Sequence, residues 1–260
     1  MKQLGRLLDF SGSTVLITGG ARGAGAAIVR QFARTGADVA FTYRGGEKEA
    51  QALVEDLRAQ GVRAEAFAFD QSDAAAAPAL LDAVEAALGT VDFLVNNAGI
   101  YPAKPLMDVS EADWDQMLDC NTKGVFFLSR EAARRMKNGG AIVNISSINA
   151  VNPAGQLAHY GISKAGVEMM TRCMAQAFGP MGVRVNCVAP GLIWKEGQEK
   201  FIPGWRESYC ERAPLGRLVQ GEDVGNACVL LCSPLSSAVT GQVLTVDCGV
   251  LLSPCFDNSL

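Results

Sequence analysis

Seven short apolar runs recur along the chain, and amphipathic or polar stretches separate them. The runs are rich in Val, Ile, Phe and Thr, which favour strands, and all of them are too short for typical helices. Near-continuous apolar strands of this length are typical of a parallel sheet that is covered on both faces. The runs occupy residues 13–18, 38–43, 62–69, 91–96, 141–146, 183–188 and 242–247.

Helical patterns lie between these runs, the clearest being residues 23–36, 73–89 and 110–140. The last pattern begins at Ser110 and stops at Gly139 and Gly140, in keeping with the preference for serine at helix starts and glycine at helix ends. Strands that alternate with helices predict right-handed βαβ units. We therefore expect an α/β fold: a single doubly wound Rossmann-type domain over residues 1–260, with a seven-stranded parallel sheet and helices on both faces.

Residues 190–221 interrupt the alternation and predict a segment that covers a substrate site. Large apolar side chains are frequent in it, which suits a hydrophobic substrate packed against it. The same side chains could instead make subunit contacts or pack the segment itself, and the sequence leaves these readings open. They are Trp194, Phe201, Ile202, Trp205 and Tyr209.

The composition suits one folded domain and argues against several classes of function. Hydrophobic residues make up 49% of the 260 residues and charged residues 19%, which fits a buried core and not disorder. The net charge is −4 and the basic residues are scattered, so we expect no nucleic-acid partner. No apolar run approaches membrane-spanning length, so we expect no membrane segment. Eight cysteines without a C-x-x-C pair, and only one histidine, predict a reduced, cytoplasmic protein without a metal site.

A glycine-rich turn, TGGARGAG at residues 18–25, follows the first predicted strand and opens the first helix. The N-terminus of a helix offers unpaired N–H groups and a partial positive charge. Glycines at Gly19, Gly23 and Gly25 would let a pyrophosphate approach the backbone closely. Because the turn lies between a strand and a helix, it predicts a dinucleotide-binding site.

These features resemble the short-chain dehydrogenase/reductase family, in its common 250-residue type. The resemblance covers essentially the whole chain and implies an oxidoreductase that exchanges a hydride between a nicotinamide and a ketone or secondary alcohol. It also implies a homo-oligomer, a tetramer or a dimer, built through the fourth and fifth helices and the last strand. The matching motifs are T-G-x-x-x-G-x-G at residues 18–25, NNAG at 96–99 after the fourth strand, and APG at 189–191 after the sixth.

The end of the second strand indicates which nicotinamide cofactor fits. In such folds an acidic residue there receives the ribose 2′-hydroxyl of NAD and repels the 2′-phosphate of NADP. By alignment with the family, Tyr43 stands at that place and Arg44 follows it, while Arg22 lies in the glycine-rich turn. Guanidinium groups suit phosphate, so we expect NADP (NADPH/NADP+) as the cofactor.

Further cofactor contacts are implied by the resemblance. Asp70, after the third strand, resembles the family residue beside the adenine ring, although a strand-end turn former is an alternative reading. The expected contacts are Gly19, Arg22, Gly23, Ala24, Gly25, Tyr43, Arg44, Asp70, Asn97, Ala98, Gly99, Tyr160, Lys164, Pro190, Gly191 and Ile193.

Tyr160 and Lys164 lie four residues apart, so their side chains can share one helix face. Hydride exchange with a carbonyl needs a separate proton donor, and a tyrosine can serve if a cation lowers its pKa of about 10. We expect Tyr160 to donate the proton and Lys164 to favour its phenolate. The resemblance implies that Lys164 also binds the nicotinamide ribose, that Ser147 hydrogen-bonds the substrate oxygen, and that a water near Asn121 links Lys164 to solvent. Ser146 remains an alternative to Ser147.

Lys195 and His159 both lie near the expected site. Many relatives read P-G-x-I-x-T after the sixth strand, with the threonine meeting the nicotinamide carboxamide, but Lys195 stands at that place. We therefore expect backbone groups near Ile193 to hold the carboxamide. His159 precedes Tyr160, and we expect it to point away from the reacting groups, at the rim of the site.

The substrate is the least determined part of the function. A hydrophobic compound, such as a hydroxysteroid or a 3-oxoacyl compound, is favoured, and a sugar or polyol is the alternative. Carrier-protein reductases usually place basic residues where Lys137, Asn138 and Met181 stand, so the docking surface for an acyl carrier looks thin. A catalytically silent NADP-binding sensor or scaffold is the alternative from another class, and the intact set of four expected catalytic residues argues against it.

Overall fold

The computed structural model describes residues 7–193 and 204–253. Its centre is a sheet of seven parallel strands in the order β3-β2-β1-β4-β5-β6-β7. Each predicted strand is present, which confirms the doubly wound parallel sheet. The strands are β1 (Thr14–Ile17), β2 (Asp38–Tyr43), β3 (Ala64–Ala68), β4 (Val91–Asn96), β5 (Gly140–Ile145), β6 (Val183–Pro190) and β7 (Val243–Val246).

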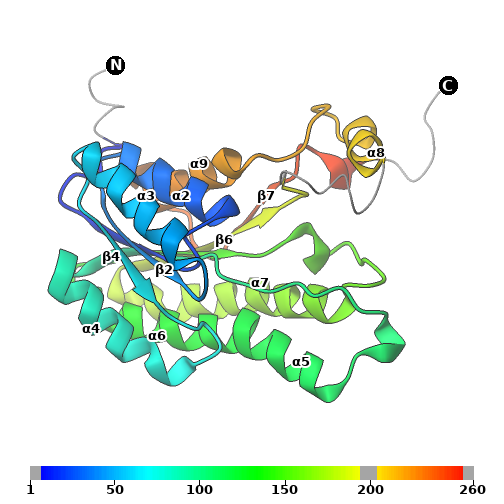
Figure 1. Ribbon diagram of the computed structural model, residues 1–260, viewed down its shortest axis with the longest axis horizontal. Coiled ribbons are helices and arrows are strands. Elements are labelled where there is room, and N and C mark those ends of the chain that lie inside the picture. The colour runs from blue at the N-terminus through cyan, green and yellow to red at the C-terminus, as the bar shows by residue number, and fades with distance from the viewer. Residues whose placement is uncertain (1–6, 194–203, 254–260) are drawn as a thin grey trace.

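Helices cover both faces of the sheet (Figure 1). One face carries α2 (Gly23–Arg34), α3 (Glu47–Ala59) and α9 (Gly221–Cys232), and the other carries α4 (Ala77–Leu88), α6 (Gly124–Arg135) and α7 (Ala158–Phe178). Short 3-10 turns are η1 (Ala74–Ala76), η2 (Leu106–Asp108), η4 (Ile148–Ala150), η5 (Gly179–Met181), η7 (Pro234–Ser236) and η8 (Val250–Leu252). None of the helices in the described part of the chain is long and apolar enough to cross a membrane.

Strand β1 shows how the core divides into two layers. Val15 and Ile17 point into the cluster shared with α2, α3 and α9, whereas Leu16 points into the cluster shared with α4, α6 and α7. All three are 0% exposed. This alternation is the two-residue period of a strand, and each fully buried aliphatic side chain contributes about 1.5–3 kcal/mol. Burial on both faces explains why the strands are continuous apolar runs.

Glycines allow α9 to approach α2 closely. A Cβ at Gly221 would lie 2.7 Å from Ala27 Cβ, and one at Gly225 would lie 2.6 Å from Gln31 Cγ. Since α2 opens with the glycine-rich turn, this contact supports the helix whose N-terminus faces the candidate site.

The helix predicted from Ser110 has a more complex course than its pattern indicated. It begins as predicted: Ser110 Oγ accepts the Asp113 N–H, and the Asp113 carboxylate accepts the Ser110 N–H at 2.9 Å. After α5 (Glu111–Leu118), however, a π-helical turn, η3 (Asp119–Lys123), precedes α6. The helix also ends at Arg135 rather than at the glycines, because Gly140 already begins β5, where a Cβ would lie 2.5 Å from the Asp92 carbonyl oxygen.

The segment at residues 190–221 contains one described helix, α8 (Trp205–Arg212), which lies beyond the carboxyl ends of the strands (Figure 1). Strand β6 runs to Pro190, two residues past its predicted end. Trp194, Lys195, Phe201 and Ile202 lie outside the described residues. The turn after β6 and α8 are therefore the parts of this segment that bear on the site.

Candidate active site

A cleft of about 910 Å³ opens at the carboxyl ends of the strands. Clefts of this size are typical of cofactor sites, and this edge of a doubly wound sheet is where such folds bind ligands. All sixteen expected cofactor contacts line it. Of the four expected catalytic residues, Ser147, Tyr160 and Lys164 line it as well, while Asn121 lies behind its wall.

The glycine-rich turn has the shape of a phosphate cradle. A Cβ at Gly25 would lie 2.0 Å from the Gly19 carbonyl oxygen, so only glycine fits there. Gly19 and Gly23 have φ of +67° and +57°, values that glycine adopts readily. No side chain caps the N-terminus of α2, so its first N–H groups remain for a ligand. The turn thus fits a dinucleotide pyrophosphate.

Asn97 and Ala98 brace this turn from the next strand. Asn97 Nδ2 donates to the carbonyl oxygens of Thr18 at 2.9 Å and Gly19 at 3.1 Å. The Ala98 N–H donates to Thr18 Oγ1 at 2.9 Å. These bonds join the ends of β1 and β4 and fix the floor of the cleft.

The adenosine end of the cleft carries Tyr43 and Arg44 at the end of β2. The Arg44 side chain is 57% exposed, and its Nη1 lies 3.9 Å from Asp70 Oδ2, a separation at which an exposed pair contributes little. The Ser72 hydroxyl donates to Asp70 Oδ1 at 2.7 Å, which is the main cause that lowers the pKa of Asp70. A phosphate can therefore take the place of Asp70 as the partner of Arg44.

Tyr160, Ser147 and Lys164 converge at the other end of the cleft. The Ser147 hydroxyl is hydrogen-bonded to Tyr160. Lys164 Nζ lies 5.8 Å from the centre of the Tyr160 ring and donates to the Ile145 carbonyl at 2.8 Å. A phenol, a hydroxyl and an ammonium at one place can donate a proton to an oxygen atom and stabilise the charge that develops on it.

Burial acts on both titratable groups of this set. It lowers the pKa of Lys164 to about 8, because desolvation disfavours the ammonium. It also raises the pKa of Tyr160, and the hydrogen bond with Ser147 offsets only part of this shift. Burial is the larger of these effects, so the phenol keeps its proton at neutral pH. The effect of Lys164 on the phenolate stays a prediction.

Ser146 and Ser147 differ in where their hydroxyls point. Ser146 Oγ is buried and lies within hydrogen-bond distance of the Lys164 carbonyl oxygen, at 3.2 Å, and of Glu168 Oε1, at 3.0 Å. Ser147 Oγ accepts the Asn149 N–H at 3.1 Å and meets Tyr160. Only Ser147 is thus placed to contact a substrate oxygen beside Tyr160.

Asn121 lies in the π-helical turn and is 0% exposed. Its Oδ1 accepts the Ile100 N–H and its Nδ2 donates to the Ile100 carbonyl, both at 2.9 Å, and Nδ2 also lies 3.1 Å from Ser163 Oγ. The side chain therefore joins α7 to the segment that follows Gly99. The extra residue of the π-helical turn gives it this direction.

The expectation for His159 is wrong. His159 is not at the rim: it is 2% exposed, and neither ring nitrogen has a hydrogen-bond partner within the described residues. Tyr209 is 5% exposed and belongs to the core, and Trp205 is partly buried against the same core cluster. For these two residues the structure agrees with the reading in which the segment packs on the protein itself. Their burial depends on contacts with distant segments, which the local sequence pattern does not show.

The cleft also contains residues that sequence reasoning missed. Tyr101 is 52% exposed and meets the Tyr160 ring edge-on, with 6.2 Å between ring centres. Its position two residues after the NNAG motif was a sign that it lies at the cleft. Gln71 lines the adenosine end and is 3% exposed, and its amide atoms have no partner in the described part of the chain.

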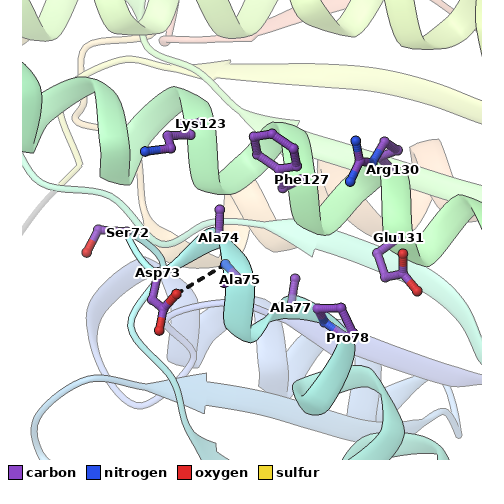
Figure 2. A pocket seen from close by; sticks show the side chains of 10 residues that line it. All are labelled: Ser72, Asp73, Ala74, Ala75, Ala77, Pro78, Lys123, Phe127, Arg130 and Glu131. Atoms are coloured by element: carbon purple, nitrogen blue, oxygen red, sulfur yellow. Dashed lines mark hydrogen bonds between the residues drawn. The ribbon is translucent and has the colours of Figure 1, made fainter.

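A second hollow, of about 500 Å³, lies between the start of α4 and α6 (Figure 2). Asp73 Oδ1 accepts the Ala75 N–H at 3.1 Å, and the Arg130 guanidinium lies 4.7 Å from the centre of the Phe127 ring, although Arg130 Nε has no hydrogen-bond partner in the described residues. The reacting groups gather in the first cleft, so we assign the active site there. In the described residues, no three His, Cys, Asp or Glu side chains are grouped so as to hold a metal ion.

Comparison with known proteins agrees with this geometry. The family model described as enoyl-(acyl carrier protein) reductase matches residues 19–251. The chain is 36% identical to a 3-oxoacyl-[acyl-carrier-protein] reductase of Staphylococcus aureus, over 92% of this chain and 98% of the relative. It is 38% identical to 3beta-hydroxysteroid dehydrogenase 1 of Eggerthella lenta, over 95% of this chain and 97% of the relative.

A similar solved structure is a gluconate 5-dehydrogenase of Burkholderia cenocepacia J2315 in complex with NADP and tartrate. It is 32% identical, with a TM-score of 0.90 over 96% of this chain and 100% of that one. The match in sequence extends over most of the chain, and the match in fold includes the cleft and its parallel sheet. The chain belongs to the short-chain dehydrogenase/reductase family and is an oxidoreductase acting on CH–OH or C=O groups.

Proposed function

We propose that the protein uses NADP(H) to interconvert a hydrophobic ketone and its secondary alcohol. The observation that carries the cofactor choice is the end of β2, where Tyr43 and Arg44 replace the acidic residue that would receive the ribose of NAD. Arg22, in the cradle, adds a second guanidinium on the same side of the cleft. NADP in the similar gluconate 5-dehydrogenase supports this choice.

The cofactor supplies a hydride when it is bound, and the protein's residues handle the proton. Tyr160 donates its phenolic proton to the substrate oxygen, and Ser147 orients that oxygen by hydrogen bonding. The Lys164 ammonium stabilises the phenolate that remains and also binds the nicotinamide ribose. Asn121 joins the π-helical turn to the segment after Gly99, and a water held near it would link Lys164 to solvent.

The hydrophobic substrate is supported by the loops at the same edge of the sheet as the cleft, of whose exposed apolar residues Tyr101 lines the cleft itself. The loops that follow the carboxyl ends of β4, β5, β6 and β7 carry exposed apolar side chains. Such side chains bury apolar substrate surface at about 25 cal/mol per Å². A hydroxysteroid or a 3-oxoacyl compound therefore fits better than a polyol. These side chains belong to Tyr101, Leu106, Met107, Val151, Leu215 and Leu252.

A second function has support of its own, and a third is tested beside it. A sugar or polyol dehydrogenase is favoured by the similarity to gluconate 5-dehydrogenases. A silent NADP-binding sensor would need only the cradle. A substrate panel separates the three: 3-oxosteroids, 3-oxoacyl thioesters, and sugar acids or polyols, each followed by nicotinamide absorbance. We expect turnover with an apolar ketone. Preference for a polyol would support the first alternative, and tight NADPH binding without any turnover would support the second.

Replacement of Arg44 tests the cofactor. We expect Arg44→Ala to weaken NADPH binding by about 10- to 100-fold, because a charge-assisted contact with the 2′-phosphate is lost, and to leave NADH binding unchanged. Arg34→Ala is a matched control, since it removes the same charge at the exposed far end of α2. Fluorescence titration of both cofactors measures the effect. Equal weakening of NADH and NADPH by Arg44→Ala would contradict the assignment.

We also infer that the protein assembles as a dimer or tetramer. The sheet ends at β7, whose outer edge needs a cover. In addition, two helices on one face of the sheet, α6 and α7, expose Phe126 (43%), Ile162 (50%) and Met169 (56%). A second copy of the chain would bury these side chains.

A further inference from the structure

The turn after β6 forms one wall of the cleft through Pro190, Gly191 and Ile193. In the proposed function this wall lies beside the nicotinamide, at the end of the cleft that holds Tyr160. The hydrogen bonds of the turn therefore decide how firmly the reacting ring can be placed.

Tyr209 reaches the turn from α8, and its hydroxyl joins three segments of the chain. It accepts the Leu192 N–H at 3.2 Å and donates to the Asp247 carbonyl at 3.1 Å. A Cβ at Gly191 would lie only 2.3 Å from the same oxygen atom, so glycine is required for the tyrosine to approach. The side chain is 5% exposed, and water cannot easily replace its contacts.

The other hydrogen bonds of the turn fix the two peptide units on either side of the Gly191–Leu192 unit that Tyr209 holds. The Gly191 N–H donates to the Val246 carbonyl at 2.9 Å, and the Val219 N–H donates to the Leu192 carbonyl at 3.2 Å. Leu192 thus uses both of its backbone polar groups. Because a peptide unit is planar, the Ile193 N–H must point away from the carbonyl oxygen that Val219 holds.

Ile193 is then the residue of the turn with backbone groups to offer. Its N–H and C=O enter none of the hydrogen bonds found among residues 7–193 and 204–253. A nicotinamide carboxamide has one donor and one acceptor group, which matches an N–H and a C=O on a single residue. The backbone can hold the carboxamide in this way only while the turn keeps its direction.

We propose that Tyr209 is a positioning residue for the nicotinamide. Its hydroxyl fixes the Gly191–Leu192 peptide unit, and this holds in place the next unit, which carries the Ile193 N–H. The inference rests on the proposed NADP(H)-dependent function. It gives α8 a role in the placement of the cofactor.

The test compares two ligands on Tyr209→Phe, a variant that keeps the ring and removes only the hydroxyl. NADPH is one ligand, and 2′-phospho-ADP-ribose, which has the same phosphates and adenosine but no nicotinamide, is the other. Titration calorimetry gives both dissociation constants without turnover. We expect NADPH to bind about tenfold more weakly, since a buried N–H loses its acceptor, and 2′-phospho-ADP-ribose to bind as it does to the wild-type protein.

Ser253→Ala is the matched control for the docking of α8. The Ser253 hydroxyl donates to the Arg212 carbonyl at the end of that helix, so the variant loosens α8 without touching the turn. We expect the control to bind both ligands normally. Equal binding of NADPH by Tyr209→Phe and wild type, or equal weakening of both ligands, would overturn the inference. Failure of the wild-type protein to bind NADPH would instead overturn the proposed function.

Discussion

Lys164 is held in a position where its charge is unfavourable. Burial brings its pKa down to about 8 from 10.5, so the unfolded chain binds a proton that the folded chain has released between these two values. The free energy of unfolding therefore rises with pH across this window as far as Lys164 is concerned. An ionisable group that weakens the fold at neutral pH is typical of a catalytic site.

The pKa of Lys164 predicts the pH dependence of the reaction. We expect kcat/KM for ketone reduction to be level below about pH 8 and to fall above it, as the ammonium that stabilises the Tyr160 phenolate is lost. Initial rates between pH 6 and about 10 would show this limb. Lys164→Arg keeps a charge over the whole range and should lack the limb in its remaining activity. If the variant lost activity over the same pH range, the decrease would belong to another titrating group.

Replacement of Tyr160 tests the proton donor. Tyr160→Phe should lower kcat by about 10²- to 10⁴-fold, because a positioned general acid is lost, while NADPH binds nearly as before. Single-turnover absorbance and a binding titration separate the two effects. Ser146→Ala is a useful comparison because its hydroxyl faces α7 instead of the cleft. Full activity of Tyr160→Phe would rule out its role as the acid.

Individual site residues were predictable where a motif fixes them locally. The glycine-rich turn, Tyr160 and Lys164 were found this way, and all expected cofactor contacts do line one cleft. The burial of His159 and the contacts of Tyr209 were not predictable, because they depend on segments distant in sequence. The pKa of Tyr160 likewise depends on how much of the chain surrounds it.

At the scale of elements, the approach of α9 to α2 supports the cradle. Gly221→Ala should lower the free energy of unfolding by about 1–3 kcal/mol, because the new methyl group would meet Ala27 Cβ at 2.7 Å and the helices would have to separate. Urea denaturation measures this change. Gly179→Ala, where a Cβ meets nothing within 4 Å in a helical backbone, should be neutral or slightly stabilising. Similar stability of both variants would show that the two helices can adjust freely.

The elements themselves followed closely from sequence. Apolar runs predicted every strand, although only the five inner strands are largely buried and the edge strands β3 and β7 are partly exposed. Ser110 marked the start of α5 correctly. The π-helical turn was missed because one extra residue hardly changes an amphipathic pattern. The interaction that favours the π-helical turn involves a residue distant in sequence, because Asn121 hydrogen-bonds both backbone groups of Ile100, after β4. Nothing in the residues around Asn121 encodes that partner.

At the scale of the whole molecule, the exposed apolar side chains of α6 and α7 predict an assembly. Phe126→Glu should shift the protein toward smaller species in analytical ultracentrifugation, because a charge would be buried against a second copy. Leu8→Glu introduces the same charge at a site of similar exposure, 38% against 43%, and should leave the mass unchanged. A monomeric wild-type protein, or an unchanged mass for Phe126→Glu, would refute an interface at this face.

The π-helical turn makes the chain sensitive to length at one place. A π-helical turn takes up about one residue more than an α-helical turn, so the helix before it and the helix after it keep their facing directions. Deletion of one residue within Asp119–Lys123 would leave a regular α-helical turn, in which α6 could stay on the sheet but Asn121 would lose its direction toward Ile100. Insertions and deletions are tolerated in most surface loops, whereas a change of length here would alter the wall of the cleft.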